Sequence, residues 1–157
     1  MSHDIFNPPN ESAADRAWRL ELTTMARLLC TRPGTRRAVK METSFPLYRI
    51  EDRANDAPLA FVAFQAIDRD FAPENPAPAR FDQLRETSRQ AGLKQLTPFF
   101  LCHWRNNHWG FAKIPDYFSI EERIPKAKNN ADVALIPLKS FLALYQYDKE
   151  TSIKIEI

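Results

Sequence analysis

Apolar residues recur along the chain with the period of a helix in some stretches and that of a strand in others. The first helical stretch is residues 12–30, where Ser12 can cap the free N–H groups of the first turn. Its apolar residues recur at intervals of four, three and four, which is the spacing of one helix face: Trp18, Leu22, Met25 and Leu29. Residues 1–11 contain two adjacent prolines and are predicted to be a flexible arm.

Three later stretches also have helical character. Residues 80–93 are predicted to be an amphipathic helix that Gly92 ends in the left-handed conformation. Its inward positions are Phe81, Leu84, Ser88 and Ala91. Residues 119–124 are predicted to form one helical turn, and residues 137–147 a helix that opens at Pro137. The apolar side of that last helix would carry Leu138, Phe141, Leu142 and Tyr145.

Strand-like runs lie between these helices. Residues 37–45, 45–51 and 58–67 predict three successive strands, with a polar turn before the third. The third run is apolar on both faces apart from Gln65, which is typical of a central strand covered on each side. Residues 71–80 contain three prolines and are predicted to be an exposed connector.

Two more strands and an edge strand complete the pattern. Residues 97–104 and 109–114 flank a tight turn at Asn106 and Asn107. Residues 152–157 alternate strictly and predict an edge strand, which would also permit pairing into a homodimer. The order of elements predicts a single α/β (α+β) domain over residues 12–157, with a central mixed sheet flanked by helices.

Composition agrees with one globular domain. The 157 residues are 44% hydrophobic and 27% charged, which is enough for a core and too short for two comfortable domains. The sequence has no apolar run near the ~20 residues that a bilayer requires, and its polar N-terminus does not resemble a signal peptide, so we expect no membrane partner and a cytoplasmic location. Cys30 and Cys102 lie in apolar runs and are predicted to be buried free thiols.

The net charge of +2 is unevenly distributed. Residues 50–86 carry eight acids and four bases, whereas residues 16–40 carry seven basic residues against Glu21 alone. Such a basic segment either contacts phosphates or is a solvated helix and loop. The candidate nucleic-acid-binding residues are Arg16, Arg19, Arg27, Arg32, Arg36, Arg37 and Lys40.

Over about residues 14–115, this order of helix, three-stranded meander, helix and strand resembles the PD-(D/E)XK nuclease superfamily, and within it the archaeal Holliday-junction resolvase type. The resemblance implies a restriction-endonuclease-like sheet. It aligns Glu21 with the family's helical glutamate and Leu47, in the dipeptide Pro46-Leu47, with its strand aspartate. Ala63-Phe64-Gln65 aligns with the acid-x-lysine triplet.

The aligned residues lack the chemistry that cutting needs. In the family, two carboxylates hold a magnesium-type ion that activates water, and the lysine stabilises developing charge. Leucine and alanine ligate nothing, and the amide of Gln65 is neutral. We therefore expect no catalytic residues, no metal and no cofactor. The alternative is an active magnesium-dependent endonuclease that uses Glu21 with Asp52 or Asp68, assisted by Gln65.

The turn between the last two main strands is rich in aromatic and basic residues: Trp104, Arg105, His108 and Trp109. This tip could stack on bases or anchor a protein partner or inhibitor target. A cross-strand pair of the two tryptophans is the structural alternative. His103 and His108 could meet across the turn, but two histidines are a poor metal site.

Two main hypotheses follow. One is a non-catalytic nuclease-like module that binds DNA or RNA, a protein partner, or both, through the basic helix and the loop after it. The other is the active nuclease. A module that recognises a protein through the aromatic turn is the third.

Overall fold

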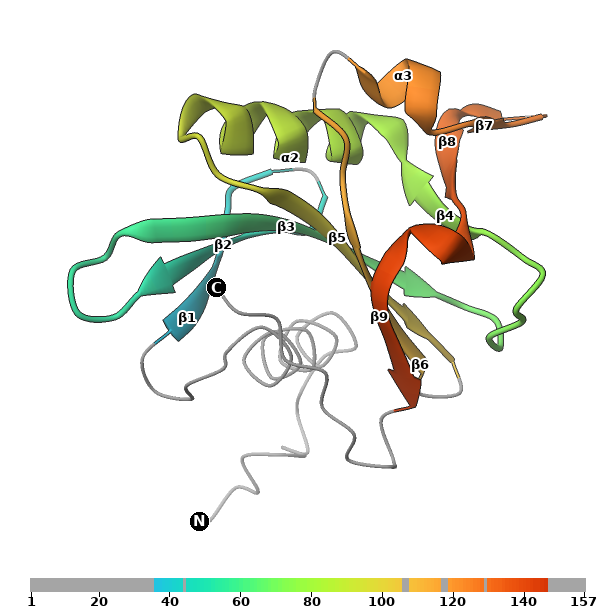
Figure 1. Cartoon of the computed structure of the whole chain (residues 1–157), viewed down its shortest axis with the longest axis horizontal. Helices are drawn as coiled ribbons and strands as arrows, with labels where there is room; N and C mark the ends of the chain where they lie inside the picture. The colour runs from blue at the N-terminus through green and yellow to red at the C-terminus, as the bar shows by residue number, and fades with distance from the viewer. Residues whose placement is uncertain (1–35, 44, 106–107, 117–118, 129, 147–157) are drawn as a thin grey trace, which may run out of the picture.

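The computed structural model describes residues 36–43, 45–105, 108–116, 119–128 and 130–146. The predicted arm, the helix at residues 12–30, the asparagine turn and the strand at residues 152–157 lie outside these residues. The described part is an α/β structure with one large mixed sheet and a smaller sheet beside a helix (Figure 1).

The large sheet has six strands in the order β1-β2-β3-β5-β6-β9. Its strands are β1 (Arg36–Lys40), β2 (Leu47–Asp52), β3 (Pro58–Ile67), β5 (Pro98–Trp104), β6 (His108–Lys113) and β9 (Phe141–Gln146). The β3–β5 pair is parallel, and all the other neighbours are antiparallel. A meander followed by a helix and a further strand is the order that the resemblance implied, and the structure adds that this strand is parallel to the third.

A second layer covers one face of this sheet (Figure 1). It holds α2 (Phe81–Leu93), the short helix α3 (Ile120–Arg123) and the three-stranded sheet β4-β8-β7. The strands of the small sheet are β4 (Ala77–Arg80), β7 (Lys126–Ala127) and β8 (Asn130–Ile136), and a 3-10 turn, η2 (Leu138–Ser140), leads into β9. The predicted helix at residues 80–93 and the helical turn at residues 119–124 are confirmed.

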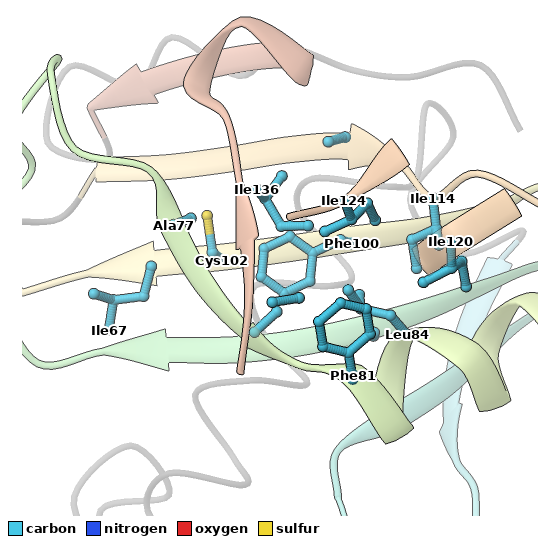
Figure 2. Packing of buried hydrophobic residues seen from close by; sticks show 14 of the residues in the cluster. Ile67, Ala77, Phe81, Leu84, Phe100, Cys102, Ile114, Ile120, Ile124 and Ile136 are labelled. Carbon is cyan, nitrogen blue, oxygen red and sulfur yellow. The ribbon is translucent and has the colours of Figure 1, made fainter. Parts of the chain in front are cut away.

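Two apolar clusters lie on opposite faces of the large sheet. The first fills the space between the sheet and the α2 layer, where Phe81 and Leu84 of α2 pack near Phe100 and Ile136 (Figure 2). The second lies on the other face and includes Ile50, Val62, Phe64, Leu101 and Phe111. Because side chains alternate along a strand, β3 contributes Ala63 to the first cluster and its neighbours to the second. The prediction of a central strand buried on both faces is confirmed.

The predicted helix at residues 137–147 is wrong. Only Leu138–Ser140 are helical, as a 3-10 turn, and β9 follows as a strand paired with β6. The apolar residues of this segment fit the period of a helix as well as that of a strand. Pairing with β6 makes the segment a strand. Phe141 packs edge-on against Trp104 at 5.8 Å, which strand geometry permits.

The connector at residues 71–80 is also more structured than predicted. Its last residues form β4, which pairs with β8 and buries Ala77 and Ala79. Pro78 is tolerated because β4 is the edge strand of the small sheet. The strand predicted at residues 37–45 is shorter, since β1 ends at Lys40.

The end of α2 differs in its detail. Gln95, not Gly92, has the left-handed backbone, with a φ of 56°. The N–H groups of Gln95 and Leu96 donate to the carbonyls of Gly92 and Ala91 at 3.2 and 2.9 Å, which satisfies the free end of the helix.

Gly110 of β6 is a position of close approach. A Cβ atom there would lie 2.9 Å from two ring carbons of Phe141 and 3.0 Å from Cys102 Sγ. We predict that Gly110→Ala lowers the free energy of unfolding by about 1–3 kcal/mol, because the added methyl overpacks this contact. Urea unfolding followed by circular dichroism measures the change.

Gly92→Ala is the matched control, since nothing lies within 4 Å of its Cβ position. Alanine in the last turn of α2 should leave stability unchanged or raise it by up to about 1 kcal/mol. Equal effects of the two substitutions would contradict the packing of β9 on β6.

Candidate functional site

The two positions that the resemblance aligned with metal-binding acids lie directly opposite each other. Leu47 of β2 pairs with Ala63 of β3, and both are 0% exposed. Paired residues share a face of the sheet, and Ala63 belongs to the cluster under α2. Gln65 points to the same face, is half-buried, and donates its side-chain N–H to the Ala66 carbonyl at 3.0 Å. The backbone therefore brings these positions together, with hydrocarbon where the family has carboxylates.

Gln83 of α2 closes this part of the sheet. It is 0% exposed, and its Nε2 donates to the carbonyls of Pro46 and Phe64, each at 2.8 Å. The N–H of Phe64 also donates to the Pro46 carbonyl, at 3.2 Å. One amide thus joins the helix to the start of β2 and to the C-terminal half of β3. Its Oε1 is buried and accepts no hydrogen bond from the described residues.

Asp52 ends β2 beside the start of β3, and Asp68 follows the last residue of β3. The ten residues of that strand separate them, a span of roughly 30 Å. Each also lies five residues from an aligned position, or about 17 Å along an extended chain. They therefore cannot share one ion with each other, and neither reaches the Leu47–Ala63 pair. Asp52 is bound by Arg36 at 3.3 Å, and the side chain of Asp68 is 99% exposed.

Glu21, the remaining acid of the nuclease alternative, lies outside the described residues. Within the ranges that the structure describes, no three His, Cys, Asp or Glu side chains are grouped to hold a metal ion. Whether Glu21 forms a site with one of the two aspartates remains a prediction for experiment.

A buried carboxylate organises the other end of β2. Glu51 is 3% exposed and accepts hydrogen bonds from Arg37 Nε at 2.8 Å and Arg49 Nε at 2.5 Å. Arg37 also binds Asp56. Burial would raise the pKa of Glu51, but the two arginines together outweigh it and hold that pKa below its usual value.

This network involves part of the predicted basic face. Arg36 and Arg37 are paired with carboxylates, and Lys40 is exposed at the end of β1. The other candidates, Arg16, Arg19, Arg27 and Arg32, lie outside the described residues. A phosphate would therefore compete with Asp52, Glu51 and Asp56 for the two arginines of β1.

A groove of about 480 Å³ lies beside the Glu51 network. Strands β1 and β2 form one side and the C-terminal half of α2 the other, with an apolar lining of Val39, Met41, Pro58 and Phe61. Its charged residues are Arg37, Arg49, Glu51, Asp56 and Lys94. Arg49 and Lys94 were not predicted as site residues, because the two lie far apart in the sequence and only the fold places them on one groove.

The aromatic turn is not an exposed tip of tryptophans. His103 pairs with Trp109, which places Trp104 and Trp109 on opposite faces of the sheet. They are 1% and 5% exposed. Trp104 packs against Phe71 at 5.2 Å, and Trp109 stacks on His103 at 3.8 Å. The predicted cross-strand tryptophan pair is therefore wrong, and base stacking on these two rings is contradicted by their burial.

The other two residues of the turn are also held in place. His108 stacks on Phe71 at 4.7 Å, on the face opposite His103, so the two histidines do not meet. Arg105 is exposed, and its Nε donates to Asp70 at 3.2 Å. The turn is thus packed against the loop that follows β3.

The predictions on the two cysteines and on membrane-spanning segments can be compared with the described residues. Cys102 is a buried free thiol, as predicted, and burial raises its pKa well above the usual value. Cys30 lies outside the described residues. No helix in the described part of the chain is long and apolar enough to cross a membrane.

Comparison with known proteins adds one structural likeness. No protein-family model matches the sequence, and no curated protein matches it. Among solved structures, the chain is similar to Hjc of Archaeoglobus fulgidus, a Holliday junction resolvase from an archaeal hyperthermophile. The identity is 11%, the match covers 87% of this chain and 99% of that one, and the TM-score is 0.43.

The Gln83 amide gives a stability prediction. We expect Gln83→Met to lower the free energy of unfolding by about 2 kcal/mol, because two buried carbonyls lose a donor. Gln90→Met, on the same helix, loses one half-buried hydrogen bond to Glu86 at 2.9 Å and should lower it by less than about 1 kcal/mol. Chemical unfolding measures both. A Gln83→Met protein as stable as the wild type would show that the bridge does not hold α2 to the strands.

Glu51 gives a pH prediction. The pKa of Glu51 is lower in the folded protein than in the unfolded chain, where a glutamate has a pKa of about 4.3. Its contribution to stability is therefore fully present above that unfolded-state pKa, and it is lost as pH falls through the folded-state pKa. Glu51→Gln should therefore be less stable than the wild type at pH 7, by about 2 kcal/mol. The difference should shrink below about pH 4. Thermal melts across pH 3–8 test this, and a difference independent of pH would contradict it.

Proposed function

We propose that this chain is a nuclease-like module that binds nucleic acid without cutting it. The observation that supports this most is the Leu47–Ala63 pair, which stands in register where metal ligands would be needed and is fully buried. Both side chains are hydrocarbon and offer an ion no ligand, and Gln83 occupies the adjoining backbone carbonyls.

Hydrolysis of a phosphodiester needs charge close to the scissile phosphate. A metal ion lowers the pKa of the attacking water, and the ion and a cationic side chain both stabilise the negative charge that develops on the phosphate. Gln65, at the aligned lysine position, offers only neutral groups. Binding requires neither a metal ion nor an activated water, since contacts of arginine and lysine with phosphates are sufficient.

The proposed contacts are the basic residues of segment 16–40, which would bind the backbone of DNA or RNA with no sequence preference. Those in the described structure lie on β1, at the edge of the large sheet. Arg36 and Arg37 hold carboxylates there, with which a phosphate would compete. We place the module in the cytoplasm. A protein partner on the same basic face is the competing hypothesis.

Labelled DNA and RNA should bind with an affinity that falls steeply with salt, because released counterions drive the association. Replacing Arg19 and Arg27 together with glutamine should weaken binding about 10-fold or more and lower the salt slope by about 2. Fluorescence anisotropy across a salt series measures both. Affinity that is independent of salt would favour the protein-partner hypothesis.

The same nucleic acids should stay intact in magnesium or manganese. Cutting by the wild type that Glu21→Gln abolishes would contradict the proposal and support the active nuclease. Cutting that persists in Glu21→Gln would also contradict it, and would exclude Glu21 as the ligand.

A further inference from the structure

We propose that the groove between β1–β2 and the C-terminal half of α2 binds one nucleotide unit, with its phosphate held between Arg49 and Lys94. This inference rests on the proposed function, since it names the site at which a nucleic acid would be held. It concerns residues outside the basic segment 16–40.

The groove exists because α2 covers only part of the sheet. The helix packs against β3 and β5, so the same face of β1 and β2 is left beside it. Arg37, Arg49 and Glu51 all point to this side, as the alternation and register of the strands require. The volume of about 480 Å³ lies within the ~300–1,000 Å³ typical of small-molecule sites.

The charges of the groove favour an anion. Both of its carboxylates are engaged: Glu51 by Arg37 and Arg49, and Asp56 by Arg37. Arg49 uses its Nε for Glu51, so its two terminal nitrogens keep their donor capacity, and its side chain is 38% exposed. Lys94 is exposed on the opposite side, and no ion pair to it occurs among the described residues.

Glu51 orients the guanidinium of Arg49. A carboxylate that is buried and bonded to Nε fixes the plane of the group, which lowers the ordering entropy of binding an oxyanion. A phosphate presents oxygens in several directions and can therefore bind an arginine and a lysine from opposite sides of the groove at once.

The rest of the groove suits the uncharged part of a nucleotide. Val39, Met41 and Phe61 line it with apolar surface, against which a sugar or the face of a base can pack. A free nucleotide and a strand of nucleic acid share this chemistry, and the two sources are separated by experiment.

The test uses the full chain and a labelled single-stranded oligonucleotide in a salt series. Lys94→Glu and Arg49→Gln should each weaken binding about 10-fold, and Lys94→Glu should lower the salt slope by about 1. Arg49→Lys should recover part of the loss, because it restores charge without the fork. Lys113→Glu is the matched control, since this exposed lysine ends β6 outside the groove, and it should change binding less than 2-fold.

Thermal melts separate binding from folding. Arg49→Gln removes one partner of buried Glu51 and is expected to lower stability, whereas Lys94→Glu changes an exposed side chain and should melt like the wild type. Loss of binding in a fully folded Lys94→Glu protein therefore supports the groove.

The remaining outcomes distinguish the inference from the proposed function. If the wild type binds the oligonucleotide and both groove variants bind equally well, the groove is overturned and the proposed function stands. Adenosine monophosphate is the second probe. If it shifts the amide NMR signals of Arg49 and Lys94 while no strand binds, the groove stands and the proposed function falls. If neither probe binds, or an acidic peptide displaces the nucleotide, the inference is overturned.

Discussion

The amide of Gln83 is the interaction on which the arrangement of helix and sheet depends. It donates to one carbonyl at the start of β2 and to another in the C-terminal half of β3, so α2 is held at a single place along both strands. The Leu47–Ala63 pair lies directly beside this bridge, since Leu47 follows Pro46 and Ala63 precedes Phe64 in the chain, and both side chains are fully buried. The buried Oε1 of Gln83 accepts no hydrogen bond from the described residues. That costs free energy, and the two hydrogen bonds of Nε2 oppose the cost.

The same placement divides the α2-facing side of the sheet into two parts. Around β3 and β5 the side chains form an apolar core with the helix. Around β1 and β2 the face carries a charged network centred on Glu51. The proposed absence of cutting and the proposed binding of a nucleotide therefore depend on the position of one helix. It bonds beside the Leu47–Ala63 pair at the start of β2 and leaves open the end of β2 that carries Arg49 and Glu51.

Much of the fold was predictable because burial leaves a clear pattern. Residues 58–67 are apolar on both faces, and the structure places them at the centre of the sheet. The helix predicted after Pro137 failed because Leu138, Phe141, Leu142 and Tyr145 fit helical spacing, while pairing with β6, distant in sequence, made the segment a strand. The alignment of Leu47 with Ala63 could be made from the order of elements, but Arg49 and Lys94 share a groove only through the position of α2.

The central claim is that core packing has replaced the metal site of a nuclease-like fold. Titration of Mn²⁺ into the full chain, followed by isothermal calorimetry or by the electron paramagnetic resonance of free Mn²⁺, tests it directly. The account predicts only weak, unsaturable binding that is the same in the wild type and in Glu21→Gln. One saturable site in the wild type that Glu21→Gln removes would contradict it.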